Sequence, residues 1–130
     1  MTKATRRKTT TKARTVTTVQ EASQPVAELD ITTRDPEGRT PLHLAAWYGY
    51  TTTVRRMLLQ HAEVDARDEK ERTPAHWSAF KGYLEVIKLL VENGADVNAR
   101  DAGGRTVLQM ALIGKQEAVE AFIRSHGGTI

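Results

Sequence analysis

Apolar residues with helical spacing recur along residues 35–130, in short runs that end near glycine. The first run presents one narrow apolar face made of Leu42, Ala45 and Ala46. The hydroxyl of Thr40 can cap a helix that begins at Pro41, where a missing backbone N–H costs nothing. Gly49 then adopts at little cost the left-handed conformation that ends a helix. The pattern predicts a short helix from Pro41 to the residue before Gly49.

A second run with helical spacing follows each first run. In the middle segment Leu84, Ile87 and Val91 recur on one helical face, and Gly94 ends the run. Such a helix pair cannot bury its apolar faces alone, so stability has to come from stacking against further pairs. About three pairs are the practical minimum.

The runs repeat with a period of 33 residues and no insertion. Three classes of residue keep this register: Asp35, Asp68 and Asp101; Arg39, Arg72 and Arg105; and Thr40, Thr73 and Thr106. The apolar residues Ile31, Val64, Val97 and Ile130 keep it as well. A match of this length indicates an internal repeat.

Two motifs resemble the ankyrin-repeat family. They are Gly-x-Thr-Pro-Leu-His at 38–43 and Gly-Ala-Asp-Val-Asn-Ala at 94–99. The resemblance covers residues 30–130 and implies an all-α ankyrin-repeat solenoid of stacked helix–turn–helix units with projecting β-hairpin-like loops. We expect a basic, disordered tail at 1–25, a partial N-terminal cover at 26–34, and repeats at 35–67, 68–100 and 101–130.

The third repeat departs from the family pattern. Val107 replaces the proline and Gln109 the histidine, and the turn glycine is expected at Gly114 rather than at position 115. Terminal repeats are usually atypical because their outer face meets water. Glu120 and Arg124 on the last helix fit that capping role.

The second repeat departs in its hairpin. Glu71 stands where the hairpin glycine is expected. A positive φ strains any residue that has a side chain, by about 1 kcal/mol or more. We therefore expect local strain at Glu71.

Charge is unevenly distributed along the chain, whose net charge is +3. Residues 1–25 hold one acid and six cations, giving +5: Lys3, Arg6, Arg7, Lys8, Lys12 and Arg14. Residues 26–130 hold 13 cations and 15 acids, giving −2. The tail is too polar to fold alone. It is interpreted either as a plain solvated segment or as an electrostatic arm, a nuclear import signal or an organellar transit peptide.

The sequence assembles no catalytic or metal site. His43 and His76 lie one period apart, and packed helices stand about 8–10 Å apart, which is too far for a shared zinc ion. The family motif implies instead a structural histidine that hydrogen-bonds near the helix start. No phosphate-binding glycine loop is present. We expect a protein that is not an enzyme and that needs no metal or cofactor.

The resemblance implies that the hairpins and the exposed side of each first helix line one concave surface. The predicted partner-binding residues on it are Glu37, Arg39, Trp47, Tyr48, Arg67, Glu69, Lys70, Arg72, Phe80, Lys81, Arg100, Arg105 and Ile113. Trp, Tyr and Arg dominate interface hot spots. In the alternative interpretation the two aromatic residues of repeat one pack over the helix turn, and the arginines at one repeat spacing pair with the aspartates.

We therefore expect a protein-interaction module, an adaptor or an inhibitor, that binds an acidic and partly apolar segment of another protein. The main alternative is that the tail binds nucleic acid or an anionic surface while the repeats serve as an anchor. A third is a designed or shortened repeat protein without a natural partner. The chain has no cysteine and no apolar stretch long enough to span a membrane. We expect a monomer when free, in the cytoplasm or the nucleus.

Overall fold

The computed structural model describes residues 29–130. The predicted tail with its cations, and the start of the predicted N-terminal cover, lie outside these residues. Within 29–130 the chain forms six α-helices: α1 Pro41–Tyr48, α2 Thr51–Leu59, α3 Pro74–Lys81, α4 Leu84–Glu92, α5 Val107–Ile113 and α6 Glu117–Ser125. None of these helices is long and apolar enough to cross a membrane.

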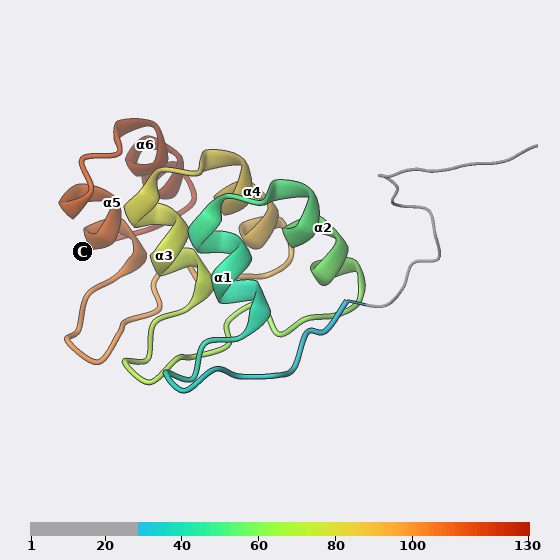
Figure 1. The fold of residues 1–130 in the computed structure, drawn as a ribbon. Coiled ribbons are helices and arrows are strands. Elements are labelled where there is room, and N and C mark those ends of the chain that lie inside the picture. Colours follow the sequence, from blue (N-terminus) through green and yellow to red (C-terminus); the bar gives the residue numbers. More distant parts are fainter. Residues whose placement is uncertain (1–28) are drawn as a thin grey trace, which may run out of the picture.

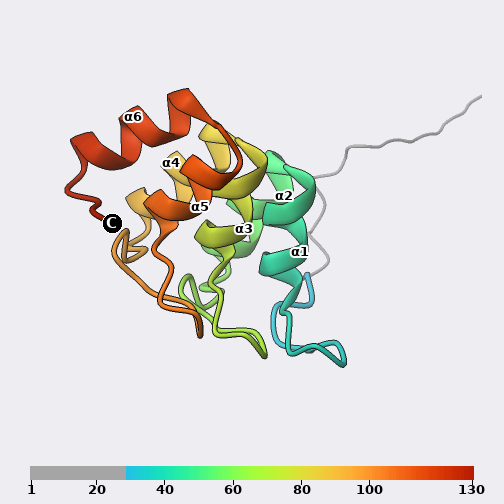
Figure 2. The ribbon, with the colours of Figure 1, turned by 90° about the vertical axis from the view of Figure 1, so that its left-hand side faces the viewer.

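The six helices form two layers, with α1, α3 and α5 in one and α2, α4 and α6 in the other (Figures 1 and 2). The loops that precede α1, α3 and α5 project together from one side of the stack (Figure 2). Backbone hydrogen bonds join neighbouring loops, from Glu69 N to the Glu37 carbonyl and from Ala102 N to the Lys70 carbonyl, both 2.9 Å. The predicted solenoid of helix pairs is confirmed.

A capping box begins the first helix of every repeat. The Thr40 hydroxyl accepts from the His43 backbone N–H, and His43 Nδ1 accepts from the Thr40 backbone N–H at 3.0 Å. Because Nδ1 accepts, the proton lies on Nε2, which donates to the Arg72 carbonyl of the next repeat at 2.7 Å. Repeat two makes the same bonds, through Thr73, His76 and the Arg105 carbonyl. The structural role predicted for these histidines is confirmed.

The last repeat uses a glutamine in the same place. Gln109 Oε1 accepts from the Thr106 backbone N–H at 2.9 Å and completes the third capping box. Glutamine therefore keeps the cap without the ring Nε2–H that bonds to the next repeat in the other two.

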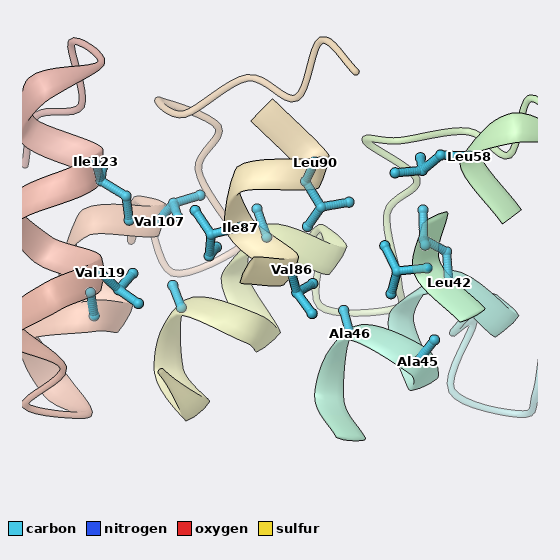
Figure 3. Close-up of a cluster of buried hydrophobic side chains, with 14 of the residues drawn as sticks. Leu42, Ala45, Ala46, Leu58, Val86, Ile87, Leu90, Val107, Val119 and Ile123 are labelled. Carbon is cyan, nitrogen blue, oxygen red and sulfur yellow. The ribbon is translucent and has the colours of Figure 1, made fainter. Parts of the chain in front are cut away.

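The core lies between the helix layers and runs through all three repeats (Figure 3). Alanine at the contact between first helices, such as Ala46 and Ala79, is fully buried and lets α1, α3 and α5 approach closely. Larger side chains from the second helices, including Ile87 and Leu90, fill the space between the layers. Burying each such side chain contributes about 1.5–3 kcal/mol. Every interface between repeats thus contributes to one continuous core.

The stack ends on polar side chains. Val54 and Ile87 are buried by the repeat that follows them, and the repeat-equivalent residue at the end of the stack is Glu120. Glu120 accepts from Arg124 Nε at 3.1 Å across one turn of α6. Water can solvate this ion pair; the capping role of the two residues stays a prediction.

The turn after α5 corrects one sequence expectation. Gly49 and Gly82 have positive φ, as predicted for Gly49, but in repeat three the left-handed residue is Lys115, with φ 58°, and not Gly114, with φ −79°. A Cβ at position 114 would overlap the carbonyl oxygen of Phe80. The stack keeps the 33-residue register, and Gly114 is there because a neighbouring backbone passes close by.

A left-handed residue with a side chain also occurs in the other two repeats. Glu71 has φ 60°, which confirms the strain predicted for its hairpin. His61 has φ 67° at the position of Gly94 and Gly127. Each repeat therefore contains one strained position that is glycine in the other two.

Side chains in the loops after α2, α4 and α6 link neighbouring repeats. Asn98 donates from Nδ2 to the Gly127 carbonyl at 3.1 Å, and its Oδ1 accepts from the Thr129 N–H at 2.9 Å. The repeat-equivalent residue is Asp65, whose carboxylate accepts from the Asp96 N–H at 3.0 Å. Burial raises the pKa of Asp65, and the nearby Asp96 charge acts in the same direction. An ionised carboxylate has no donor for the carbonyl that an asparagine would bind.

Candidate partner-binding surface

Three aromatic rings from two neighbouring repeats meet on the face formed by α1 and α3. Trp47 and Phe80, at equivalent positions, stack with ring centroids 6.3 Å apart and planes 5° apart. Trp77 meets Trp47 edge-on at 4.8 Å. The predicted pair of Trp47 and Phe80 therefore lies on one side of the molecule, as the repeat register requires.

Trp77 was missed by the sequence analysis. Its repeat-equivalents are Leu44 and Met110. The ring is mostly buried, and its indole N–H donates to Asp68 Oδ2 at 3.2 Å. The available signal was an aromatic residue three positions before Phe80, at a site where the other repeats carry aliphatic side chains.

Cations lie over the faces of the two tryptophans. The Arg72 guanidinium is 4.5 Å from the Trp77 ring centroid, and Lys81 Nζ is 4.7 Å from that of Trp47. Arg39 also approaches Trp77, at 5.6 Å. Cation–π contacts of this kind are worth about 0.5–1 kcal/mol when exposed and more when dry. They hold the charges beside the rings.

These residues enclose a hollow on the surface. Its volume is about 270 Å³, and it is lined by Trp47, Arg72, Trp77, Phe80 and Met110. The lining comes from α1, α3, α5 and the hairpin before α3. The walls are apolar except for the guanidinium, an arrangement that is typical of binding pockets.

The arginines at one repeat spacing, Arg39, Arg72 and Arg105 (the arginine ladder), form ion pairs with the aspartates, as the alternative interpretation proposed. Arg39 Nε donates to Asp35 Oδ2 at 2.7 Å, and Arg105 Nε to Asp101 Oδ2 at 3.2 Å. Burial opposes ionisation of Asp101, but hydrogen bonds from Arg105 and the Arg105 charge outweigh it, so the pKa of Asp101 lies below its ordinary value. The ladder therefore stabilises the hairpins, whatever else it contacts.

A smaller depression of about 110 Å³ separates the first two hairpin tips. The residues that line it are Glu37, Arg39, Asp68, Glu69, Lys70 and Arg72, so most of the predicted charged residues of repeats one and two meet here. Arg39 also forms an ion pair with Glu37. The depression is polar and adjoins the aromatic hollow through Arg72.

The other predicted residues lie apart from the hollow. Arg67 Nη1 donates to the Glu71 and Arg100 carbonyls, and Arg100 Nη1 donates to the Gly104 carbonyl, so both side chains support hairpins. Tyr48 is exposed and stacks on Tyr50 with centroids 5.5 Å apart. Ile113 is exposed on α5. Partner contact by these residues stays a prediction.

Within residues 29–130, no three His, Asp or Glu side chains are grouped so that they could hold a metal ion. The two buried histidines are neutral caps: burial lowers the pKa of His43 and of His76, against hydrogen bonds to the next repeat's carbonyl.

The fold defines a class of protein, the repeat solenoid of stacked helix pairs. A family model described as "Ankyrin repeats" matches the chain in three copies, over residues 12–101 and 56–130. The chain belongs to the ankyrin-repeat family, as its motifs indicated. Ankyrin repeats are in general protein–protein interaction modules and are typically not enzymes. A comparison with curated proteins gives no match.

Proposed function

We propose that this chain is a non-enzymatic adaptor or inhibitor that holds another protein on the aromatic hollow and the adjoining hairpins. The hollow is the observation that carries the proposal. Its lining of Trp, Phe, Met and Arg consists of the residue types enriched at protein interfaces. Burying such a cluster under a partner removes apolar surface from water, which contributes about 25 cal/mol per Å².

The charges around the hollow set the chemistry of the partner. Arg72 and Lys81 lie over its tryptophans, while Asp68 is mostly buried and already accepts from Trp77. A partner that brings carboxylates beside an apolar side chain complements this arrangement. We therefore propose an acidic, partly apolar segment of a protein in the cytoplasm or the nucleus.

Affinity capture with the full chain as bait tests the proposal. Changing Trp47, Tyr48 and Phe80 together to alanine should abolish capture of the proteins that the wild-type chain enriches, with helical content by circular dichroism retained. Leu59→Ala is the matched control, since Leu59 is 73% exposed on α2, in the other helix layer. Capture that survives the triple substitution would remove the hollow from the function.

The charged tail supplies a second candidate function, because residues 1–25 carry +5 and the rest of the chain −2. Binding of nucleic acid or another polyanion through the tail would fall steeply with salt. It would also vanish when residues 1–18 are deleted, whereas binding centred on the aromatic hollow should tolerate both changes. Capture at low and high salt, with and without the tail, separates the two functions.

A further inference from the structure

The three repeats hold the ladder arginine in two different ways. In repeats one and three, Arg39 and Arg105 donate from Nε to Oδ2 of their aspartates. In repeat two the Arg72 Nε lies 3.4 Å from Asp68 Oδ2, is buried, and makes no hydrogen bond within the described chain. A buried donor without a partner is costly, by about 1–3 kcal/mol.

Trp77 explains the difference. Its indole N–H donates to the same Asp68 Oδ2 that would otherwise accept from Arg72, and the Arg72 guanidinium lies 4.5 Å from the centroid of its ring. Leu44 and Met110, at this position in the other repeats, have no N–H to compete. Arg72 therefore keeps an ion pair with Asp68 at 3.4 Å but no hydrogen bond from Nε, and its side chain lines the hollow.

We propose that the hollow accepts one aromatic side chain of an acidic peptide segment, and that Arg72, whose Nε makes no hydrogen bond to Asp68, binds a carboxylate next to that side chain. This inference rests on the proposed function and specifies the ligand of the same site. A hollow of about 270 Å³ has room for a ring, since an apolar cavity of about 150 Å³ in another protein binds benzene. Arginine pairs with carboxylates through strong, charge-assisted hydrogen bonds.

A cationic ligand is excluded by the same geometry. Aromatic clusters bind ammonium groups over their ring faces. Here the two tryptophan faces already carry Arg72 and Lys81. A third positive charge would be repelled by both, whereas a carboxylate is attracted to both.

Fluorescence polarisation with the full chain and a labelled peptide tests the inference. The probe has one phenylalanine flanked by two glutamates on each side; its partners replace the phenylalanine by alanine, or the glutamates by glutamine. The acidic aromatic peptide should bind saturably, and each change in the peptide should weaken binding about tenfold or more. The Trp77 indole N–H signal in the ¹⁵N NMR spectrum should shift on addition of the first peptide only.

Variants locate the effect. Arg72→Gln should lower the affinity for the acidic aromatic peptide about tenfold. It should change the affinity for the glutamine peptide less than about twofold. Trp77→Met, which introduces the residue found at position 110, should lower the affinity for the acidic aromatic peptide to a similar extent. Without the indole N–H, Asp68 Oδ2 is free to accept from Arg72 Nε. Arg55→Gln is the control, since Arg55 is exposed on α2, in the other helix layer, and it should stay within about twofold of wild type.

The outcomes separate this inference from the proposed function. No saturable binding up to about 1 mM peptide, or equal binding to Arg72→Gln, overturns the inference. Binding that ignores the phenylalanine and disappears in salt shows unspecific anion binding and overturns it too. If protein capture is still lost in the triple alanine variant, the proposed function stands without this ligand. Should Trp77→Met unfold by circular dichroism, the result with Arg72→Gln decides alone.

Discussion

Acid should destabilise this protein through its two buried histidines. His43 and His76 are fully buried and bonded as neutral rings, with the pKa of each lowered chiefly by burial. In the unfolded chain both rings take up a proton as the pH falls through about 6.5, while in the folded chain they stay neutral to lower pH. The unfolded state then binds more protons, so stability is complete above pH 6.5 and declines below it.

The size of the effect follows from the number of protons. Each proton bound only by the unfolded chain lowers the free energy of unfolding by up to about 1.4 kcal/mol for each pH unit that the pH falls. Two histidines together lower it by up to about 2.7 kcal/mol per pH unit. A domain of this size is stable by about 5–15 kcal/mol. The aspartates with lowered pKa, Asp30, Asp35 and Asp101, matter only near and below pH 3.8. Between pH 5 and 6.5 the histidines should therefore dominate.

Urea unfolding from pH 5 to 7.5, followed by circular dichroism, measures this slope. The double variant with His43→Gln and His76→Gln should keep both caps, as Gln109 does in repeat three, and should lose most of the slope below pH 6.5. His61→Gln with His126→Gln is the control, because both of those residues are exposed and the slope should not change. Equal slopes in the wild-type chain and the His43/His76 variant would refute the argument.

Two further predictions concern single positions that differ between repeats. Asp65→Asn should raise the free energy of unfolding by about 1 kcal/mol at pH 7, because it supplies the donor that Asn98 has and removes a carboxylate whose ionisation burial opposes. The gain should shrink as the pH falls toward 4, and an unchanged urea midpoint at pH 7 would contradict it. Lys115→Gly should stabilise by about 1 kcal/mol by relieving a positive φ, whereas Gly114→Ala should destabilise by about 2 kcal/mol or more because its Cβ meets the Phe80 carbonyl. A lower melting temperature for Lys115→Gly than for Gly114→Ala would contradict the turn geometry described above.

The fold was predictable because its determinants are local and repeated. Thr40 and Pro41 mark a helix start within a few residues, and the 33-residue register extends that mark to the other repeats. The structural histidines followed from the same motif. Features that depend only on residues close in sequence can be predicted from the sequence alone. A helix cap is such a feature, because it needs only the residues of its own first turn.

The details that failed or were missed depend on contacts between repeats. Gly114 was expected to be left-handed because glycine favours that conformation, but the carbonyl of Phe80, from the previous repeat, is what requires a residue without a side chain. Trp77 was overlooked since its effect arises only when Asp68 and Arg72 are seen beside it. A repeat pattern in the sequence does not predict which side chains of different repeats come into contact.

The repeat architecture separates the positions that hold the stack from the positions that distinguish one repeat from another. Capping threonines occur in all three repeats, whereas the position of Trp77 carries a different apolar residue in each. That position lies beside Asp68 and Arg72, so a change there alters the hydrogen bonding of this pair. Repeat two is also the only described repeat with a neighbour on each side, and Trp47 and Met110 from those neighbours complete its hollow. Binding should therefore depend on the middle repeat more than on either end of the stack.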